Sequence, residues 1–253
     1  MKNIFLFVGL FIFSALSAQF DNINPGEVVS FRIHYGFITA GNATLSTTKT
    51  SYKGQPAFYV RGVGKTSGAA KAFFKVEDVY ESYINENKEP LFYLRNVSEG
   101  SYTQNLQSTF NPNNNTLVLV DKKHTDRPAK TVKVPNDVQD ILSCFYYLRS
   151  VDNLKVGTVL KMSVWIDDEL FPFQLKVAGT EKISTKFGKV NCLKIIPSVV
   201  SGRVFKDKEG VTMWVTNDQN RVPVLIKAEL AVGSLKASID SYANVKYPIK
   251  FEK

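Results

Sequence analysis

Histidine and cysteine are the side chains most often used for acid–base and nucleophilic chemistry near neutral pH, and this sequence has two of each. His34 alternates outward from a strand-like segment, and His124 lies in a segment typical of a turn. Cys144 and Cys192 have no histidine nearby in the sequence, and no G-x-S-x-G motif marks a nucleophilic serine. We therefore predict that the chain is not an enzyme, and we assign no catalytic residue.

A bound metal is not expected either. The usual zinc site needs histidine and cysteine ligands at close spacing, whereas His34 and His124 are far apart and the cysteines form no close pair. Asp167, Asp168 and Glu169 offer oxygen atoms to a hard cation, but three consecutive acids between two apolar runs are typical of a solvated turn. We predict no metal site and no cofactor.

Two further patterns resemble known sites without matching them. Glu77 and Glu81 would form a carboxylate pair for glycan hydrolysis, but residues four apart in a strand share a face without close contact. Residues 62–66 (GVGKT) lack the G-x-x-x-x-G-K-[ST] spacing of a phosphate-binding loop. A hydrolase of the cell envelope is therefore only the third of our functional hypotheses, after two non-catalytic ones, and it depends only on the export that residues 1–18 predict.

Positive charge is densest at residues 122–133, which lie between two apolar alternating runs and are expected to form a hairpin. A charged rim of this kind docks on anionic lipid or polysaccharide in some proteins, and in others it only prevents strand edges from pairing. Because the charges are spread over the whole hairpin, we favour the second interpretation. The basic side chains are Lys122, Lys123, Arg127, Lys130 and Lys133.

Two-residue alternation of apolar and polar side chains dominates the rest of the chain and predicts β-strands. Many of these runs are separated by only a few residues, so neighbouring strands should form hairpins in an antiparallel sheet. The alternating segments are 29–35, 76–84, 160–166, 171–177, 211–215, 222–228 and 235–239.

Two segments depart from this alternation. Residues 137–149 have the apolar spacing of an amphipathic helix, for which Asn136 or Asp137 suits the N-cap, and residues 68–74 (GAAKAFF) predict a short helical turn. The apolar face of the longer helix would carry Ile141, Leu142, Cys144, Phe145 and Leu148.

We therefore predict a mainly β fold with a strongly curved antiparallel sheet, half-barrel or open barrel-like. The main α-helix, at about 137–149, would pack on the concave face of this sheet. No linker marks a boundary, so a single domain is favoured over two β subdomains joined by the helix.

The first 18 residues are expected to be a signal peptide. Lys2 precedes an apolar run, residues 4–13, and small residues follow up to Ala18. The run is shorter than a membrane-spanning helix, which needs about 20 residues, and no later stretch is long and apolar enough to span a membrane. Residues 19–253 would then form one β-rich domain, exported to the periplasm or associated with the outer membrane.

Charge and cysteine content are consistent with export. The chain has 253 residues and a formal net charge of +9, which favours anionic partners. Because we expect the protein to be exported, we do not predict nucleic acid as a partner. An oxidising compartment permits a disulfide between Cys144 and Cys192. Buried free cysteines also suit a helix face and a strand, which is where these two residues are predicted to lie.

Several short phrases, in this order and spacing, resemble a known family. Together they cover nearly all of the chain after the signal peptide and are similar to the exported, β-rich domain-of-unknown-function family 3108 of Gram-negative bacteria. The resemblance implies a largely antiparallel β domain of the periplasm or envelope, and this family has no agreed activity or catalytic residues to transfer. The phrases are 26–27 (GE), 35–43 (YGFITAGNA), Asp140-Ile141-Leu142 with Tyr146 and Arg149, 188–192 (GKVNC), 214–218 (WVTND) and 221–224 (RVPV).

Bulky aromatic side chains are abundant for a β chain with one main helix, since the sequence has 18 Phe and 11 Tyr. Concave and barrel-like sheets often bind ligands in their openings. Our leading hypothesis is a non-catalytic envelope protein that binds a lipid or another hydrophobic ligand in a groove of the curved sheet. The alternative is an interaction or scaffold protein with a filled core, whose partner would be another envelope component.

The signal peptide leads to a direct test. If cleavage follows Ala18, N-terminal sequencing of the mature protein should begin near Gln19. A mature protein that retains the apolar run at residues 4–13 would contradict the predicted export signal.

Overall fold

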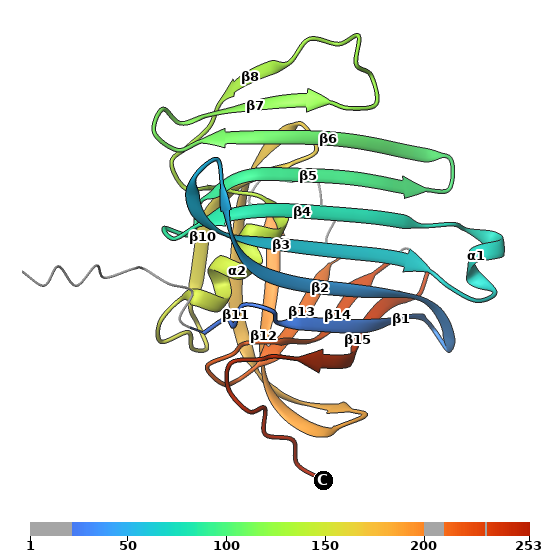
Figure 1. The fold of residues 1–253 in the computed structure, drawn as a ribbon. Helices are drawn as coiled ribbons and strands as arrows, with labels where there is room; N and C mark the ends of the chain where they lie inside the picture. Colours follow the sequence, from blue (N-terminus) through green and yellow to red (C-terminus); the bar gives the residue numbers. More distant parts are fainter. Residues whose placement is uncertain (1–21, 200–209, 231) are drawn as a thin grey trace, which may run out of the picture.

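The computed structural model describes residues 22–199, 210–230 and 232–253. The signal peptide predicted at 1–18 lies outside the described residues. Within them, 15 strands form one open, strongly curved sheet, accompanied by two helices (Figure 1). The prediction of a mainly β fold with a curved antiparallel sheet is confirmed. Neither helix of this described part is long and apolar enough to cross a membrane.

The strands before the main helix are β1 (Val28–Tyr35), β2 (Ile38–Tyr52), β3 (Gln55–Thr66), β4 (Glu77–Asn85), β5 (Pro90–Glu99), β6 (Tyr102–Asn111), β7 (Thr116–Asp121), β8 (Lys130–Lys133) and β9 (Val138–Gln139). Those after it are β10 (Val159–Ile166), β11 (Glu169–Thr185), β12 (Gly188–Val199), β13 (Val211–Thr216), β14 (Pro223–Glu229) and β15 (Ser234–Ala243). The helices are α1 (Ala70–Phe73) and α2 (Ile141–Ser150).

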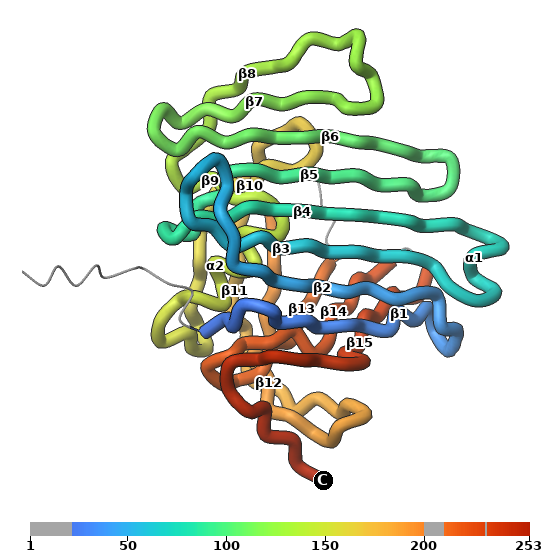
Figure 2. Tube along the Cα trace, in the orientation of Figure 1, coloured from blue at the N-terminus to red at the C-terminus, as the bar shows by residue number. Residues whose placement is uncertain are grey.

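The sheet is built almost entirely from hairpins, as the short separations predicted. In spatial order the strands run from β8 down to β1 and then from β15 down to β9 (Figure 2). β1 and β15 pair antiparallel and so join the two halves of the chain. Among the described strands only β9 pairs in parallel, with β10. The edge strand β8 carries Lys130 and Lys133, charges that discourage pairing with another edge.

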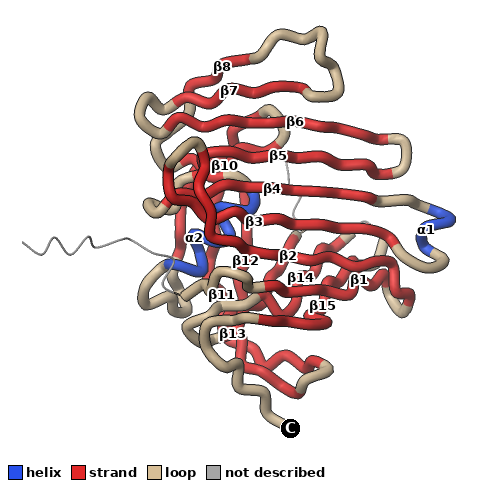
Figure 3. Tube along the Cα trace, in the orientation of Figure 1, coloured by secondary structure: helices blue, strands red, loops and turns tan. Residues whose placement is uncertain are grey.

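Antiparallel pairing places the connections alternately at two ends of the sheet. At one end lie the β1–β2 turn, α1, the β5–β6 turn and the β7–β8 loop, and we call it the open end (right in Figure 1; α1 is blue in Figure 3). The β14–β15 turn lies there too, because Leu235 pairs with Tyr35 beside the β1–β2 turn. The opposite end carries the turns at 53–54, 86–89 and 112–115.

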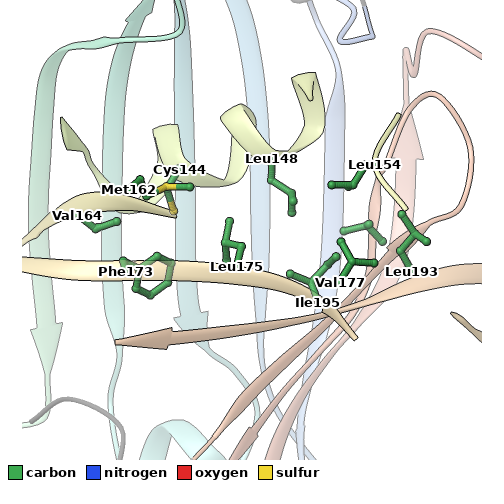
Figure 4. Close-up of a cluster of buried hydrophobic side chains, with 11 residues drawn as sticks. Cys144, Leu148, Leu154, Met162, Val164, Phe173, Leu175, Val177, Leu193 and Ile195 are labelled. Atoms are coloured by element: carbon green, nitrogen blue, oxygen red, sulfur yellow. The ribbon is translucent and has the colours of Figure 1, made fainter. Parts of the chain in front are cut away.

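Helix α2 lies on the concave face and is covered on both sides. On one side Cys144 and Leu148 pack against side chains of β10, β11 and β12, such as Met162, Leu175 and Ile195 (Figure 4). On the other side Leu142 and Tyr146 pack against Phe58, Val60 and Ile84 of β3 and β4. The curved sheet therefore folds around the helix, and most of the interior is filled there.

A second contact brings the two halves of the sheet together. Trp165 of β10 is buried among side chains of β5, β6 and β7, and its indole Nε1 donates a hydrogen bond to Ser108 Oγ at 3.0 Å. This tryptophan belongs to an alternating run, but sequence periodicity does not show which distant strand covers it.

The main helix begins later than predicted, at Ile141, and ends at Ser150. Its N-cap is Asp140 rather than Asn136 or Asp137: the Asp140 carboxylate accepts hydrogen bonds from the backbone nitrogens of Leu142 and Ser143, both at 2.8 Å. The preceding residues Val138 and Gln139 are extended, because they pair with β10 as β9.

The buried face of α2 also differs from the prediction. Leu142, Cys144 and Leu148 are buried, but Ile141 is exposed and Phe145 is only half-buried. Tyr146 and Arg149 are buried instead, because sheet covers the helix on a second side.

Arg149 and Glu27 form the most deeply buried ion pair in the described structure. Their side chains are 1% and 2% exposed, and two parallel hydrogen bonds join Nη1 to Oε1 at 2.6 Å and Nη2 to Oε2 at 2.9 Å. Arg149 Nε also donates to the carbonyl of Asn220 at 3.0 Å, in the β13–β14 turn. The pair thus ties the end of α2 to the segment that begins β1 and to the C-terminal half of the sheet.

Packing of α2 should account for much of the stability of the fold. Replacing Leu148, which is fully buried, by alanine should lower the free energy of unfolding by about 2–5 kcal/mol in urea denaturation. Ile141→Ala, on the exposed side of the same helix, is the control and should cost less than about 1 kcal/mol. Equal losses in the two variants would contradict the observed orientation of the helix.

Candidate functional site

An apolar groove lies between α2 and the open end of the sheet. It has a volume of about 520 Å³ and is lined by β1, β2, β3, β4, β5, β15 and α1. Its apolar walls include Ile33 and Leu235 on one side and Phe74 and Val76 on the other. The groove is therefore the part of the concave face that the helix leaves uncovered.

Two glycines of β3 show where the helix stops covering the sheet. A Cβ atom at Gly62 would lie 3.6 Å from the Leu142 side chain of α2, whereas a Cβ atom at Gly64 would meet nothing within 4 Å. The two residues share one face of β3, since they are two positions apart. Gly64 lines the groove, so a side chain at this position would enter it.

Gly41 is needed where β2 approaches β3. A Cβ atom there would lie 2.3 Å from the backbone oxygen of Lys65, which no side chain tolerates. Gly36, in the β1–β2 turn, has a φ of 56° and uses the left-handed region that favours glycine. Both glycines belong to the phrase at residues 35–43, which therefore shapes one wall of the groove.

The polar side chains of the groove include two carboxylates. Asp78 is largely buried, and its Oδ1 accepts a hydrogen bond from the backbone nitrogen of Ser98 at 3.1 Å. Burial raises the pKa of Asp78, and the neighbouring Glu99 raises it further. The walls thus combine apolar surface with acceptors suited to a hydroxyl or amine group, and among the described residues no histidine or cysteine lines the groove.

The histidines lie away from this groove. His34 lines a separate, more polar cavity of about 360 Å³ with Arg32 and Asp240, which pair at 3.0 Å. His124 lies in the β7–β8 loop with its Nδ1 atom 2.7 Å from Asp121 Oδ2.

The other acidic residues considered from the sequence lie in ion pairs, in a turn or, for Glu169, at the exposed start of β11. Glu77 pairs with Lys75 at 3.2 Å, and Glu81 pairs with Arg61 at 3.4 Å. Asp167 and Asp168 form the β10–β11 turn. In the described ranges no group of three or more His, Cys, Asp or Glu side chains is arranged to hold a metal ion.

Both cysteines are buried free thiols in the structure. Burial raises the pKa of Cys144 above its ordinary value and that of Cys192 to about 12. Neither thiol therefore has the lowered pKa of a nucleophilic cysteine.

Four polar residues of the family phrases, Glu27, Asp140, Tyr146 and Arg149, hold the fold together. Besides the Glu27–Arg149 pair, the Tyr146 hydroxyl lies 2.8 Å from Thr47 Oγ1, and Ser82 Oγ donates to Asp140 Oδ2 at 2.7 Å. These contacts fasten α2 to β2 and β4.

With its groove, the chain is an open, barrel-like β protein. Residues 30–240 match the family DUF3108, described as a protein of unknown function, so the chain belongs to this family. The resemblance inferred from the sequence phrases is confirmed. No curated protein matches the chain.

Three solved structures are similar to this chain. A β-barrel-like protein of the domain of unknown function DUF1849 from Brucella abortus has a TM-score of 0.59 at 6% identity, covering 89% of this chain and 100% of that one. A DUF1089 family protein from Pseudomonas aeruginosa has a TM-score of 0.32 at 8% identity, covering 88% and 95% of the two chains. A protein with a YmcC-like fold from Bacteroides fragilis has a TM-score of 0.37 at 9% identity, covering 87% and 98%. The first of these supports a shared fold.

Asp140 should make stability depend on pH. Burial raises the pKa of its carboxyl group from 3.8 to about 6, although Ser82 and the helix backbone donate hydrogen bonds to it. Between about pH 4 and pH 6 the folded protein therefore holds a proton that the unfolded chain has released. The contribution of this group to stability is greatest below that window and falls as the pH rises through it.

Asp140→Asn removes this titration and keeps an oxygen for the N-cap. When the pH is lowered from about 7 to about 4, the unfolding free energy of wild type should rise by about 2–3 kcal/mol relative to that of the variant, as measured by urea denaturation. Asp168→Asn, in the exposed β10–β11 turn, is the control and should follow wild type. A wild-type profile parallel to that of Asp140→Asn would show that Asp140 does not titrate in this window.

Proposed function

We propose that this protein is a non-catalytic, exported envelope protein that binds one lipid or other hydrophobic ligand in the groove between α2 and the open end. The observation that carries the proposal is the open, mainly apolar groove of about 520 Å³ at Gly64. This volume lies within the range of about 300–1,000 Å³ that is usual for small-molecule sites. Ile33, Leu235 and Val76 would contact the apolar part of the ligand, and Asp78 would accept a hydrogen bond from a polar group.

The proposed export rests on the signal peptide predicted at residues 1–18, with residues 19–253 as one envelope domain in the periplasm or at the outer membrane. The alternative of an interaction or scaffold protein requires a filled interior. The clusters around α2 fill the interior near the opposite end, but the groove continues the same concave face beyond the part that α2 covers. This difference favours a ligand-binding protein over a purely structural one.

The groove can be narrowed without disturbing the backbone. Gly64→Leu adds a side chain that points into open space, and leucine suits a strand better than glycine does. We expect this variant to bind N-phenyl-1-naphthylamine, an uncharged apolar dye with one N–H group, at least about tenfold more weakly than wild type in a fluorescence titration, with an unchanged melting temperature.

Gly179→Leu is the matched control, because a Cβ atom at Gly179 in β11 also meets nothing within 4 Å but lies outside the groove. It should bind the probe as wild type does. Equal affinity of wild type and Gly64→Leu, or absence of probe binding by wild type, would contradict the proposed function. Native mass spectrometry offers a second measurement. If the proposal holds, wild-type protein purified from the envelope should carry the added mass of a bound ligand, and Gly64→Leu should lack it.

A further inference from the structure

The loops of the open end carry large apolar side chains that nothing covers. Phe37 in the β1–β2 turn is fully exposed, Phe73 of α1 is 90% exposed, and Val232 of the β14–β15 turn is 75% exposed. Ile38 and Tyr102, beside these loops, are also exposed. We call these five side chains the apolar rim. Burying even two of them against an apolar phase would be favourable, because it removes large apolar surfaces from water.

The apolar rim belongs to one end of the molecule only. The turns at the opposite end, 53–54, 86–89 and 112–115, consist of Lys, Gly, Glu, Asn and Pro. The hairpin turns at the two ends of the sheet thus differ: these three are polar, and those of the open end carry aromatic and aliphatic tips.

Basic side chains on two segments flank the apolar rim. Segments 65–77 and 121–130, which contain α1 and the β7–β8 loop, hold seven basic and three acidic residues. Lys123 donates to the backbone oxygen of Thr103 at 3.1 Å, so the basic loop lies against β6 next to Tyr102. The acidic residues Asp121 and Glu77 each contact a basic neighbour, Arg127 and Lys75. The basic residues are Lys65, Lys71, Lys75, Lys122, Lys123, Arg127 and Lys130.

We propose that the open end docks on an anionic phospholipid surface, with the apolar rim inserted among the headgroups and the flanking lysines over the lipid phosphates. Phenylalanine tips on separate loops, with basic side chains on two neighbouring segments, have the composition of an interfacial membrane-binding surface. The charge complementarity selects a lipid surface over an apolar protein partner, because lysine is depleted in protein interfaces.

Docking in this orientation would turn the groove toward the bilayer. Phe74, half of whose surface is exposed, lies beside Phe73 of the rim and also lines the groove. A ligand would then pass between membrane and groove without crossing water. This last step rests on the proposed function, whereas membrane docking itself does not.

Vesicle co-sedimentation tests the docking. The full-length mature protein should sediment with vesicles of phosphatidylcholine and phosphatidylglycerol, and much less with phosphatidylcholine alone. Phe37→Ser with Phe73→Ser should weaken this binding at least about tenfold. Both positions are exposed, so the melting temperature should stay unchanged. Val156→Ser, at an exposed apolar residue away from the rim, is the control and should bind as wild type does.

Charge reversal tests the electrostatic part. Lys71→Glu with Lys122→Glu should weaken binding to the mixed vesicles by at least about tenfold. Lys49→Glu with Lys155→Glu makes the same change in net charge at exposed positions outside the open end, and it should bind nearly as wild type does.

Several results would overturn the docking proposal: no sedimentation of wild type with mixed vesicles, equal sedimentation with neutral ones, or no effect of the rim substitutions. If wild type self-associates in sedimentation velocity and the rim variant does not, while neither binds vesicles, the rim is a protein interface instead. Titration with N-phenyl-1-naphthylamine in the absence of vesicles tests the groove separately. Because the rim variant keeps Gly64, it should bind this dye as wild type does even if the docking proposal fails.

Discussion

The ion pair between Glu27 and Arg149 is the contact on which the arrangement of the interior depends. Two charges buried to this degree are tolerated only when they bind each other and their remaining hydrogen-bonding capacity is used. Here the guanidinium also reaches the carbonyl of Asn220, and the carbonyl of Arg149 accepts from Arg221 at 2.7 Å and from Asn22. The end of α2 is thereby held against both halves of the sheet at one point.

This position of α2 determines where the interior is full and where it is open. The helix is ten residues long, so it spans about 15 Å, less than the length of the strands that it covers. Anchored by Arg149 at its C-terminal end and by Asp140 at its N-terminal end, it covers β3 as far as Gly62 and leaves Gly64 free. The groove is thus a consequence of a short helix fixed at both ends inside a longer sheet.

Much of the fold could be predicted from alternation alone, because hairpin strands carry their own periodicity and turn residues. The start of α2 could not, since Val138 and Gln139 are extended only because β10 lies beside them. Residues 62–66 are a more instructive case. Their glycines suggest a loop, yet they lie in β3, where Gly62 makes room for Leu142 and Gly64 borders the groove. A local pattern does not show what approaches a glycine from another part of the chain.

The groove and the apolar rim could not be predicted from the sequence for the same reason. Phe37, Phe73 and Tyr102 are scattered along the chain, and only the order of the strands brings their loops to one end. By itself, the basic hairpin at residues 122–133 indicates only a charged strand edge. Its position beside Tyr102 makes it part of the surface that we propose to bind membranes. Alternation predicts that His34 and Ile33 face opposite sides of their strand. It does not predict that each side chain lines a cavity.

The pairing of β1 with β15 has a consequence for how the chain reaches this structure. A chain that emerges with its N-terminus first can form the hairpins from β1 to β8 early, but β1 remains an unpaired edge until residues 234–243 have followed. Contacts of such long sequence separation form slowly, and exposed edges promote association in the meantime. Truncation near the C-terminus would therefore leave an open edge in the middle of the sheet, and a chaperone that shields β1 would have its greatest effect before β15 is made.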